Sequence, residues 1–395
     1  MIGISKLYCD TVEPSDVLRY NRNSGKLPSH LLQFSEDKRP VAIMNITRRC
    51  NLKCVHCYAG SDNSLAPDEL TTDQWMKVLD DLAEFGSPVA LFSGGEPLTH
   101  PGLSKLAQHA VDLGMRAVIS TNGTLITEEK AEEFASIGLS YIGISLDGSR
   151  EVHDSFRGKE GSFDKTIIGL RNAQKAGIKT GLRFTLSKRN VEDIPAIFDI
   201  IEEENIPRIC FYHLVYTGRG NDMKADTVPH DKSRETVDYI IDRTAALHKQ
   251  GRLVEVLTVD NHCDGPYLYM RLLKENPERA KEVMTLLGYN GGNSTGVGVS
   301  SISWNGDVLP DQFWRHHILG NVKDKKFGDI WTDQSNEFLM KLKKKKEHVI
   351  GRCAACKFLD ICGGNFRARA EAISGNIWAP DPACYLTDKE IGIED

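Results

Sequence analysis

Apolar and polar positions follow two different periods along the first half of the chain. Two segments, 71–86 and 162–177, repeat apolar residues at helical spacing, begin at Ser or Thr and end at Gly. Six short apolar runs rich in β-branched residues predict buried strands, and they cover 41–49, 88–95, 115–123, 141–148, 179–186 and 208–215. Strands that are apolar throughout and separated by helices predict an α/β fold with a parallel sheet covered on its outer face.

Distinctive polar residues come directly after four of these predicted strands. The first strand is followed by a run of cysteines, and the second by SGGEP at 93–97. The third is followed by STNG at 120–123 and the fourth by SLDG at 145–148. Chemistry in parallel sheets and barrels lies at the carboxyl ends of the strands. The sequence therefore predicts one functional site at that edge.

The second half of the chain has a different texture. Residues 226–295 are charged and have a helical pattern, interrupted by NHCDGPYLYM. From residue 296 onward, short strands and turns precede a second group of cysteines. We place the boundary between the two textures near residue 290.

Charge and hydropathy exclude several classes of function. The chain has 395 residues and a formal net charge of −6, which gives no reason to expect nucleic-acid binding. It has no run of eighteen apolar residues, and its first ten residues lack the layout of a signal peptide, so no membrane partner is expected. These features predict a cytoplasmic protein. In that compartment, ten cysteines indicate metal ligands or catalytic groups rather than disulfides.

Three of the cysteines, Cys50, Cys54 and Cys57, lie within eight residues. Thiolates suit zinc and iron–sulfur clusters. A structural zinc site is closed by four ligands, and no fourth cysteine is near in sequence. An open coordination position is typical of a catalytic metal site.

The C-x3-C-x2-C spacing of CNLKCVHC resembles that of the radical S-adenosylmethionine superfamily, and the strand-end motifs of that superfamily follow in order over residues 40–220. The resemblance implies a partial (β/α)6 TIM-like barrel over 40–225, preceded by an N-terminal extension over 1–39. It also implies that Cys50, Cys54 and Cys57 hold three irons of a 4Fe–4S cluster. S-adenosylmethionine would chelate the fourth iron and be cleaved to a 5′-deoxyadenosyl radical. His56 takes a place where Tyr or Phe is common.

The same resemblance assigns the strand-end residues to S-adenosylmethionine. Glu96 is expected to accept from the methionyl ammonium, and Arg183 to pair with the methionyl carboxylate. The short polar groups, including Ser120, have the alternative of capping the following helices, and Arg183 that of a salt bridge across the barrel. The full set of expected cofactor contacts is Gly94, Gly95, Glu96, Thr121, Asn122, Ser145, Asp147 and Arg183. In HDSFRG, His153 and Arg157 are expected either to face an acidic substrate or to fix a loop.

The second group of cysteines consists of Cys353, Cys356, Cys362 and Cys384. Four thiolates can close a zinc site or a complete 4Fe–4S cluster. Their order resembles the SPASM/twitch-type extension of the superfamily, which implies a smaller C-terminal iron–sulfur α+β domain over 296–395, joined to the barrel by a helical linker region over 226–295.

The fuller version of this extension has seven cysteines and two clusters. Here Phe366 and Asp311 stand where two further cysteines are usual. The resemblance therefore implies one auxiliary cluster, which makes two 4Fe–4S clusters in the protein. Of the remaining cysteines, Cys210 is expected to be a buried apolar residue, Cys9 is unassigned, and Cys263 is a candidate for the substrate site.

Over its whole length the chain resembles the haem-pathway branch of the superfamily. This implies a tetrapyrrole substrate, 12,18-didecarboxysiroheme, which would lose two acetate side chains to give iron-coproporphyrin III. A low-potential donor such as ferredoxin or flavodoxin would supply electrons. Cationic and aromatic candidates for binding the tetrapyrrole are Tyr20, Arg22, Trp314, Arg315, His316 and His317.

Four alternatives stay open at this point. Three lie within the superfamily: a decarboxylating haem synthase, a haem d1 maturation enzyme and a peptide-modifying enzyme. The fourth is an iron–sulfur electron-transfer or sensor protein, which would not account for the GGEP motif and the other strand-end motifs.

Overall fold

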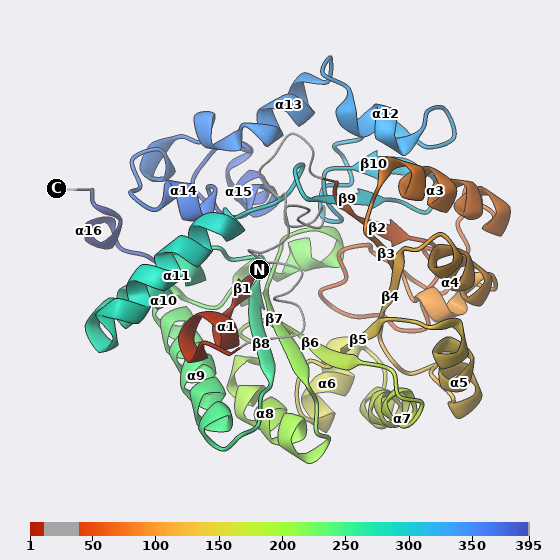
Figure 1. Ribbon diagram of the computed structural model, residues 1–395, viewed down its shortest axis with the longest axis horizontal. Helices are drawn as coiled ribbons and strands as arrows, with labels where there is room; N and C mark the ends of the chain where they lie inside the picture. The colour runs from red at the N-terminus through yellow and green to blue at the C-terminus, as the bar shows by residue number, and fades with distance from the viewer. Residues whose placement is uncertain (12–38, 394–395) are drawn as a thin grey trace.

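The structure, a computed structural model, describes residues 1–11 and 39–393 and is built around one curved sheet (Figure 1). Seven strands run parallel and pair in chain order. They are β2 (Val41–Asn45), β3 (Val89–Ser93), β4 (Arg116–Thr121), β5 (Tyr141–Ser145), β6 (Thr180–Leu186), β7 (Arg208–His213) and β8 (Glu255–Val259). The parallel α/β sheet predicted from the apolar runs is confirmed.

Helices cover the outer face of this sheet (Figure 1). They are α3 (Thr72–Phe85), α4 (Leu103–Asp112), α5 (Glu128–Ile137), α6 (Arg150–Arg157), α7 (Ser162–Lys175), α8 (Ile194–Glu203) and α9 (His230–Lys249). Helix α3 illustrates why these segments of the sequence form helices. Thr71 and Gln74 form a capping box at its start, and Trp75, Leu79 and Leu82 bury its apolar stripe.

The segment over 226–295 differs from the helical linker that the sequence predicted. It contains α9, α10 (Asp264–Glu275) and α11 (Pro277–Asn290), but also strand β8, which continues the barrel sheet beside β7. All five residues of β8 are buried. Such a short strand, apolar at most positions and set between long charged helices, has little weight in a pattern of helical periodicity. The barrel therefore has one parallel strand more than the predicted six.

The N-terminal residues close one edge of the sheet. Strand β1 (Ile2–Gly3) pairs antiparallel with β8, and α1 (Ile4–Cys9) packs on β8, α9 and α11. The predicted extension over 1–39 is thus part of the core in its first residues. Among the described residues, none of the helices is long and apolar enough to cross a membrane.

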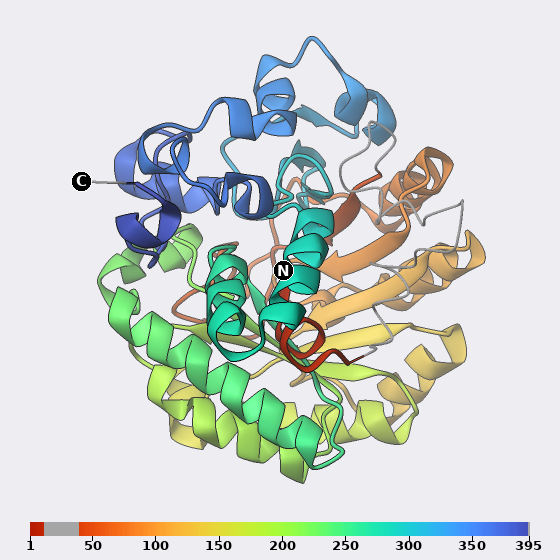
Figure 2. The same ribbon diagram turned by 60° about the vertical axis from the view of Figure 1, so that its left-hand side comes forward.

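The C-terminal segment closes the other edge and runs along one side of the barrel (Figures 1 and 2). Strand β9 (Val299–Ile302) pairs parallel with β2, and β10 (Asp307–Leu309) and β11 (Gly320–Asn321) extend the sheet antiparallel. The remaining helices are α12 (Phe327–Thr332), α13 (Glu337–Lys343), α14 (Leu359–Cys362), α15 (Arg367–Ser374) and α16 (Asp388–Ile391). Short 3-10 helices are η1 (Pro97–Thr99), η2 (Val191–Asp193), η3 (Gly218–Asp226), η4 (Lys345–Glu347) and η5 (Gly351–Cys353).

Candidate active site

A cavity of about 1140 Å³, open to solvent, lies at the carboxyl ends of the parallel strands. The prediction that the strand-end motifs meet at one place is confirmed. Of the residues expected there, the following line the cavity: Cys50, Cys54, His56, Cys57, Gly94, Gly95, Ser120, Thr121, Asn122, Ser145, Arg157 and Arg183.

The loop that carries Cys50, Cys54 and Cys57 is held from several sides. The amide of Cys50 donates to the carbonyl of Asp62 over 2.6 Å. Arg219, from η3, donates from Nε to the carbonyl of Cys54 (2.7 Å) and from Nη1 to the carbonyl of Ser61 (2.8 Å). These bonds fix the backbone of the loop that brings Cys50, Cys54 and Cys57 into the lining of the cavity.

The two glycines of SGGEP bring this turn against the cysteine loop. A Cβ on Gly95 would lie 2.3 Å from the carbonyl oxygen of Arg49, and a Cβ on Gly94 would lie 2.4 Å from that of Thr47. Gly94 also has φ +133, a conformation that side chains disfavour. The glycines are therefore required by the backbone of the neighbouring loop.

The three thiols fit a metal cluster. The side chains of Cys50 and Cys54 are buried, and burial, followed by the nearby Glu96, raises the pKa of Cys50 to about 12. Iron binding requires thiolates and would displace these protons. Hydrogen-bond donors already face two of the sulfurs: the amide of Leu52 lies 3.4 Å from Cys50 Sγ, and Arg157 Nη1 lies 3.5 Å from Cys54 Sγ.

Glu96 is buried behind the wall of the cavity and is not one of its lining residues. Its Oε1 accepts from Thr121 Oγ1 (2.7 Å) and from the Leu98 amide (3.1 Å), and its Oε2 accepts from the Asn122 amide (2.8 Å). Burial raises the pKa of Glu96 to about 7. A carboxylate offers about four acceptor positions, so Oε2 retains one beyond this network.

The position of Asp147 differs from that of the expected cofactor contact. Asp147 does not line the cavity but is fully buried beside it, where it forms an ion pair with Arg157 and accepts from the Thr185 amide over 2.8 Å. His153 Nδ1 accepts a hydrogen bond from the Asp147 amide over 3.1 Å. Of the two roles expected for His153 and Arg157, the structure supports the fixing of a loop.

The other predicted contacts lie in the cavity wall with local partners of their own. Arg183 donates from Nη1 to Ser120 Oγ over 2.8 Å, and its guanidinium lies 4.8 Å from the centre of the Tyr212 ring. Asn122 donates to Asn51 Oδ1 over 2.9 Å and accepts from the Thr124 amide. The cross-barrel salt bridge considered for Arg183 is replaced by this hydroxyl and ring contact.

Sequence reasoning missed the wall of the cavity formed by Tyr212, His213, Asp260 and Phe313. His213 ends β7, and its Nε2 lies 3.0 Å from Oδ2 of Asp264. Asp260 follows β8 with φ +64, and burial raises its pKa to about 6. His213 was the one residue near the carboxyl end of the predicted strand 208–215 that could have signalled a functional group. Asp260 had no such signal, because β8 was not recognised.

The second group of cysteines also converges. Cys353, Cys356, Cys362 and Cys384 line one small cavity, as predicted from their spacing. Cys263, expected near the substrate, lies in this cavity instead and contacts Asn261 Oδ1 over 3.1 Å. Strand β8 brings Asp260 to the large cavity, and the chain then turns into α10, so Cys263 at the start of that helix lies at the second cavity.

Phe366 and Asp311, which stand where two further cysteines are usual, both have structural partners of their own. Phe366 packs with Trp314 and Leu342 in a small apolar cluster. Asp311 is buried and accepts from Thr295 Oγ1 (2.7 Å) and from the Phe313 amide (2.8 Å). Cys210 is buried within β7, as predicted.

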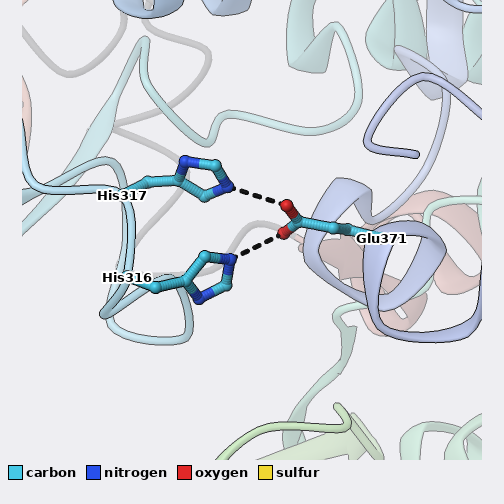
Figure 3. A group of neighbouring side chains, drawn as sticks. All are labelled: His316, His317 and Glu371. Atoms are coloured by element: carbon cyan, nitrogen blue, oxygen red, sulfur yellow. Dashed lines mark hydrogen bonds and ion pairs between the residues drawn. The ribbon is translucent and has the colours of Figure 1, made fainter. Parts of the chain in front are cut away.

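Among the candidates for tetrapyrrole contacts, the four that the structure describes do not line the cavity. They are Trp314, Arg315, His316 and His317. His316 and His317 both point at Glu371 of α15, with Nε2–O distances of 3.0 and 2.9 Å (Figure 3). Arg315 donates to the carbonyl of Ala59 over 2.8 Å, and Trp314 is buried. Together these bonds fasten the segment beside Phe313 to α15 and to the cysteine loop. Tyr20 and Arg22 lie outside the described residues.

Comparison with known proteins agrees with this architecture. The model of the radical SAM superfamily matches residues 44–201, and that of the SPASM iron–sulfur cluster-binding domain matches residues 296–357. The chain is 61% identical to Fe-coproporphyrin III synthase of Methanosarcina barkeri over 395 residues, which is 99% of each chain. It is 39% identical to pre-heme d1 synthase of Dinoroseobacter shibae, covering 90% of this chain and 88% of that one.

Solved structures show the same fold. SuiB of Streptococcus suis, bound to S-adenosylmethionine, superposes with a TM-score of 0.69 at 19% identity, covering 88% of this chain and 77% of that one. The enzyme anSMEcpe with bound AdoMet and a Cp18Cys peptide gives a TM-score of 0.67 at 19% identity, covering 89% and 95%. Cysteines at the carboxyl ends of parallel strands, the matched family models and the whole-chain relatives agree. The chain belongs to the radical SAM superfamily and is a radical SAM enzyme with a SPASM iron–sulfur domain.

Proposed function

We propose that this enzyme removes the two acetate side chains of 12,18-didecarboxysiroheme and so forms iron-coproporphyrin III. The observation that carries the proposal is the 61% identity to an Fe-coproporphyrin III synthase over 99% of both chains. This match extends over the segments that form the cavity walls as well as over the metal-binding loops.

Two sets of cysteines would hold two 4Fe–4S clusters. Cys50, Cys54 and Cys57 would hold the first, with one iron left for S-adenosylmethionine, and the second would be closed by Cys353, Cys356, Cys362 and Cys384. When bound, the first cluster and S-adenosylmethionine supply a 5′-deoxyadenosyl radical. Four cysteines facing one cavity also suit zinc, and an iron and sulfide analysis separates the two.

The strand ends would hold S-adenosylmethionine beside the first cluster. Arg183, which lines the cavity, suits the methionyl carboxylate. Glu96 lies behind the wall, so its free acceptor position on Oε2 would reach the methionyl ammonium only after its side chain turns toward the cavity. Thr121, Asn122 and Ser145 would orient the cofactor through hydrogen bonds, and Gly94 and Gly95 keep the adjoining backbone in place. In this arrangement Asp147 acts through Arg157 rather than on the cofactor.

The wall formed by Tyr212, His213 and Asp260 would face the tetrapyrrole. A substrate with many carboxylates needs cationic and hydrogen-bonding partners, and His213 is held by the buried carboxylate of Asp264 at 3.0 Å. The segment that contains Phe313 is held beside the cavity by two hydrogen bonds, one from Thr217 Oγ1 to the Phe313 carbonyl (2.9 Å) and one from Arg315 to the Ala59 carbonyl (2.8 Å). A ferredoxin or flavodoxin is the class of electron donor that we expect.

Anaerobic incubation with S-adenosylmethionine, a reductant and 12,18-didecarboxysiroheme tests this function. Mass spectrometry should show the loss of two whole acetate substituents, together with 5′-deoxyadenosine. Conversion of iron-coproporphyrin III to haem, with the siroheme derivative unchanged, would contradict the proposal and favour the activity named for the AdoMet-dependent heme synthase of Methanosarcina barkeri, 32% identical over 86% of this chain and 94% of that one.

A further inference from the structure

A buried arginine faces the cysteine loop. Arg157, at the end of α6, is 6% exposed, and its Nη1 lies 3.5 Å from Sγ of Cys54. Hydrogen bonds to sulfur are long, so this distance is that of a donor and a sulfur acceptor. Arg219 holds the same loop but donates to the carbonyls of Cys54 and Ser61. Arg157 therefore reaches a ligand sulfur, whereas Arg219 reaches the backbone.

The charge of Arg157 is balanced by Asp147, which is fully buried and forms an ion pair with Nη2. Asp147 is itself fixed, because its Oδ1 accepts from the Thr185 amide and its own amide donates to His153. A buried arginine needs such a partner, since an unpaired charge in the interior is costly. The pair places a guanidinium against Cys54 in one defined orientation.

Backbone hydrogen bonds also hold the end of α6 against the cysteine loop, and so keep Arg157 close to Cys54. The carbonyls of Phe156 and Arg157, at the end of α6, accept from the amides of Val55 (3.0 Å) and Lys53 (3.2 Å). The last carbonyls of a helix lack partners within it, and here the cysteine loop supplies them. Gly158 allows the close approach, because a Cβ there would lie 2.6 Å from the Lys53 carbonyl oxygen. Cys54 and Arg157 are therefore held together by backbone as well as by side chain.

We propose that Arg157 sets the reduction potential of the first cluster by donating a hydrogen bond to the Cys54 thiolate, and that Asp147 positions it. Reduction adds negative charge to a cluster, and a donor at a ligand sulfur stabilises that charge. Arg157 thus keeps the potential within reach of a low-potential electron donor. The inference rests on the proposed function in one respect, namely that Cys54 ligates the cluster.

The test is a redox titration of the reconstituted holoenzyme, monitored by electron paramagnetic resonance. The first cluster is identified by the change that S-adenosylmethionine causes in its spectrum, and the second serves as an internal reference. The informative variant combines Arg157→Met with Asp147→Asn. This double variant removes both members of the ion pair, so no buried charge loses its partner and the net charge stays the same. A change in potential is then due to the loss of the hydrogen bond to Cys54. The matched control combines Arg208→Met with Glu255→Gln, which removes an ion pair (3.5 Å) at the amino ends of β7 and β8 and also leaves the net charge unchanged.

In the double variant we expect the potential of the first cluster to become more negative, with at least a tenfold less favourable reduction equilibrium. For a one-electron couple, tenfold corresponds to about 59 mV. The control pair variant and the second cluster should show no shift. An unchanged potential in the Arg157→Met, Asp147→Asn variant with full iron content would overturn the inference. An equal shift in the control pair variant would also overturn it, since that would indicate a general effect of removing an ion pair.

Failure of the underlying assignment gives a different result. If the signal that responds to S-adenosylmethionine persists when Cys50, Cys54 and Cys57 are all replaced by Ala, then these cysteines do not hold the first cluster. That result would remove the ligand on which Arg157 is proposed to act, whereas loss of the signal leaves the titration as the deciding measurement.

Discussion

The hydroxyl of Tyr385 donates to Oδ1 of Asp264 over 2.6 Å, and this bond joins the surroundings of the two cysteine groups. Tyr385 directly follows Cys384, whose side chain lines the small cavity of the second group. Oδ2 of Asp264 lies 3.0 Å from His213, which lines the large cavity. All three side chains are buried, so one hydrogen-bonded chain runs from one site to the other.

Removing the central carboxylate of this chain should destabilise the protein. Asp264→Asn keeps the shape of the side chain but replaces one of the two acceptor oxygens with a donor, so Tyr385 and His213 no longer both have an acceptor, and the negative charge that strengthens both bonds is lost. We expect the free energy of unfolding to fall by about 1–3 kcal/mol, measured by urea denaturation. Asp73→Asn is the control, because Asp73 is largely exposed and should change stability by less than about 0.5 kcal/mol.

Asp260 should make stability depend on pH. Burial raises its pKa from 3.8 to about 6, so the folded state binds a proton more tightly than the unfolded state does. The stability from this group is present below about pH 4 and is lost as pH rises to about 6. The loss amounts to about 3 kcal/mol at pH 7.

Asp260→Asn should therefore stabilise the cluster-free protein at pH 7, with a gain that shrinks toward pH 4. Asn also tolerates the φ of +64 at this position. The same variant should lower the rate of product formation, because Asp260 lines the cavity. Equal stability of variant and wild type at all pH values would contradict the assignment of a raised pKa.

Replacing Cys50, Cys54 and Cys57 by Ala should abolish formation of 5′-deoxyadenosine and leave about four irons per chain, those of one remaining cluster. Iron analysis and chromatography of the nucleoside products measure both quantities. Cys9→Ala is the control, since Cys9 lies in α1 and lines neither cavity, and it should retain full iron content and cleavage. Cleavage by the triple variant would refute the assignment.

Five cysteines line the second cavity, and the four-ligand assignment makes them unequal. Cys384→Ala should lose the second cluster and still cleave S-adenosylmethionine, whereas Cys263→Ala should keep the iron content of the wild type. If the second cluster takes part in electron transfer, the soluble Cys384→Ala enzyme should cleave the cofactor without completing product. Full product yield without that cluster would leave it a structural role.

Gly95→Ala should disturb the cysteine loop, because its Cβ would meet the Arg49 carbonyl oxygen at 2.3 Å. We expect a loss of stability of about 1–3 kcal/mol and reduced iron incorporation at the first site. Gly288→Ala is the control, since it lies in α11 with nothing within 4 Å of an added Cβ. That variant should be more stable by up to about 1 kcal/mol.

The sequence predicted the elements whose apolar pattern is long or regular. Strands β2 to β7 were found because each is an apolar run bounded by helices and turn residues. The cysteine loop was found from the spacing of its three cysteines. Strand β8 was missed, and with it the position of Asp260 and Cys263. Its five residues bury both faces, so neither alternation nor helical spacing distinguishes them.

Pairing between distant residues was the other limit. The sequence placed Asp147 after a strand, where a cofactor contact and an internal ion pair are equally possible. Its partner Arg157 is on α6, and the choice depends on which way the end of that helix faces. Likewise, Tyr385 and Asp264 lie 121 residues apart, and no local pattern connects them.

The pairing of β9 with β2 has a consequence for synthesis on the ribosome. Val41 aligns with Val299, so the edge of β2 stays open until more than three quarters of the chain has been translated. An open strand edge is a template for association with other chains. We therefore expect the nascent barrel to depend on chaperones until its C-terminal segment emerges, and truncation before residue 299 to yield aggregates rather than an isolated barrel.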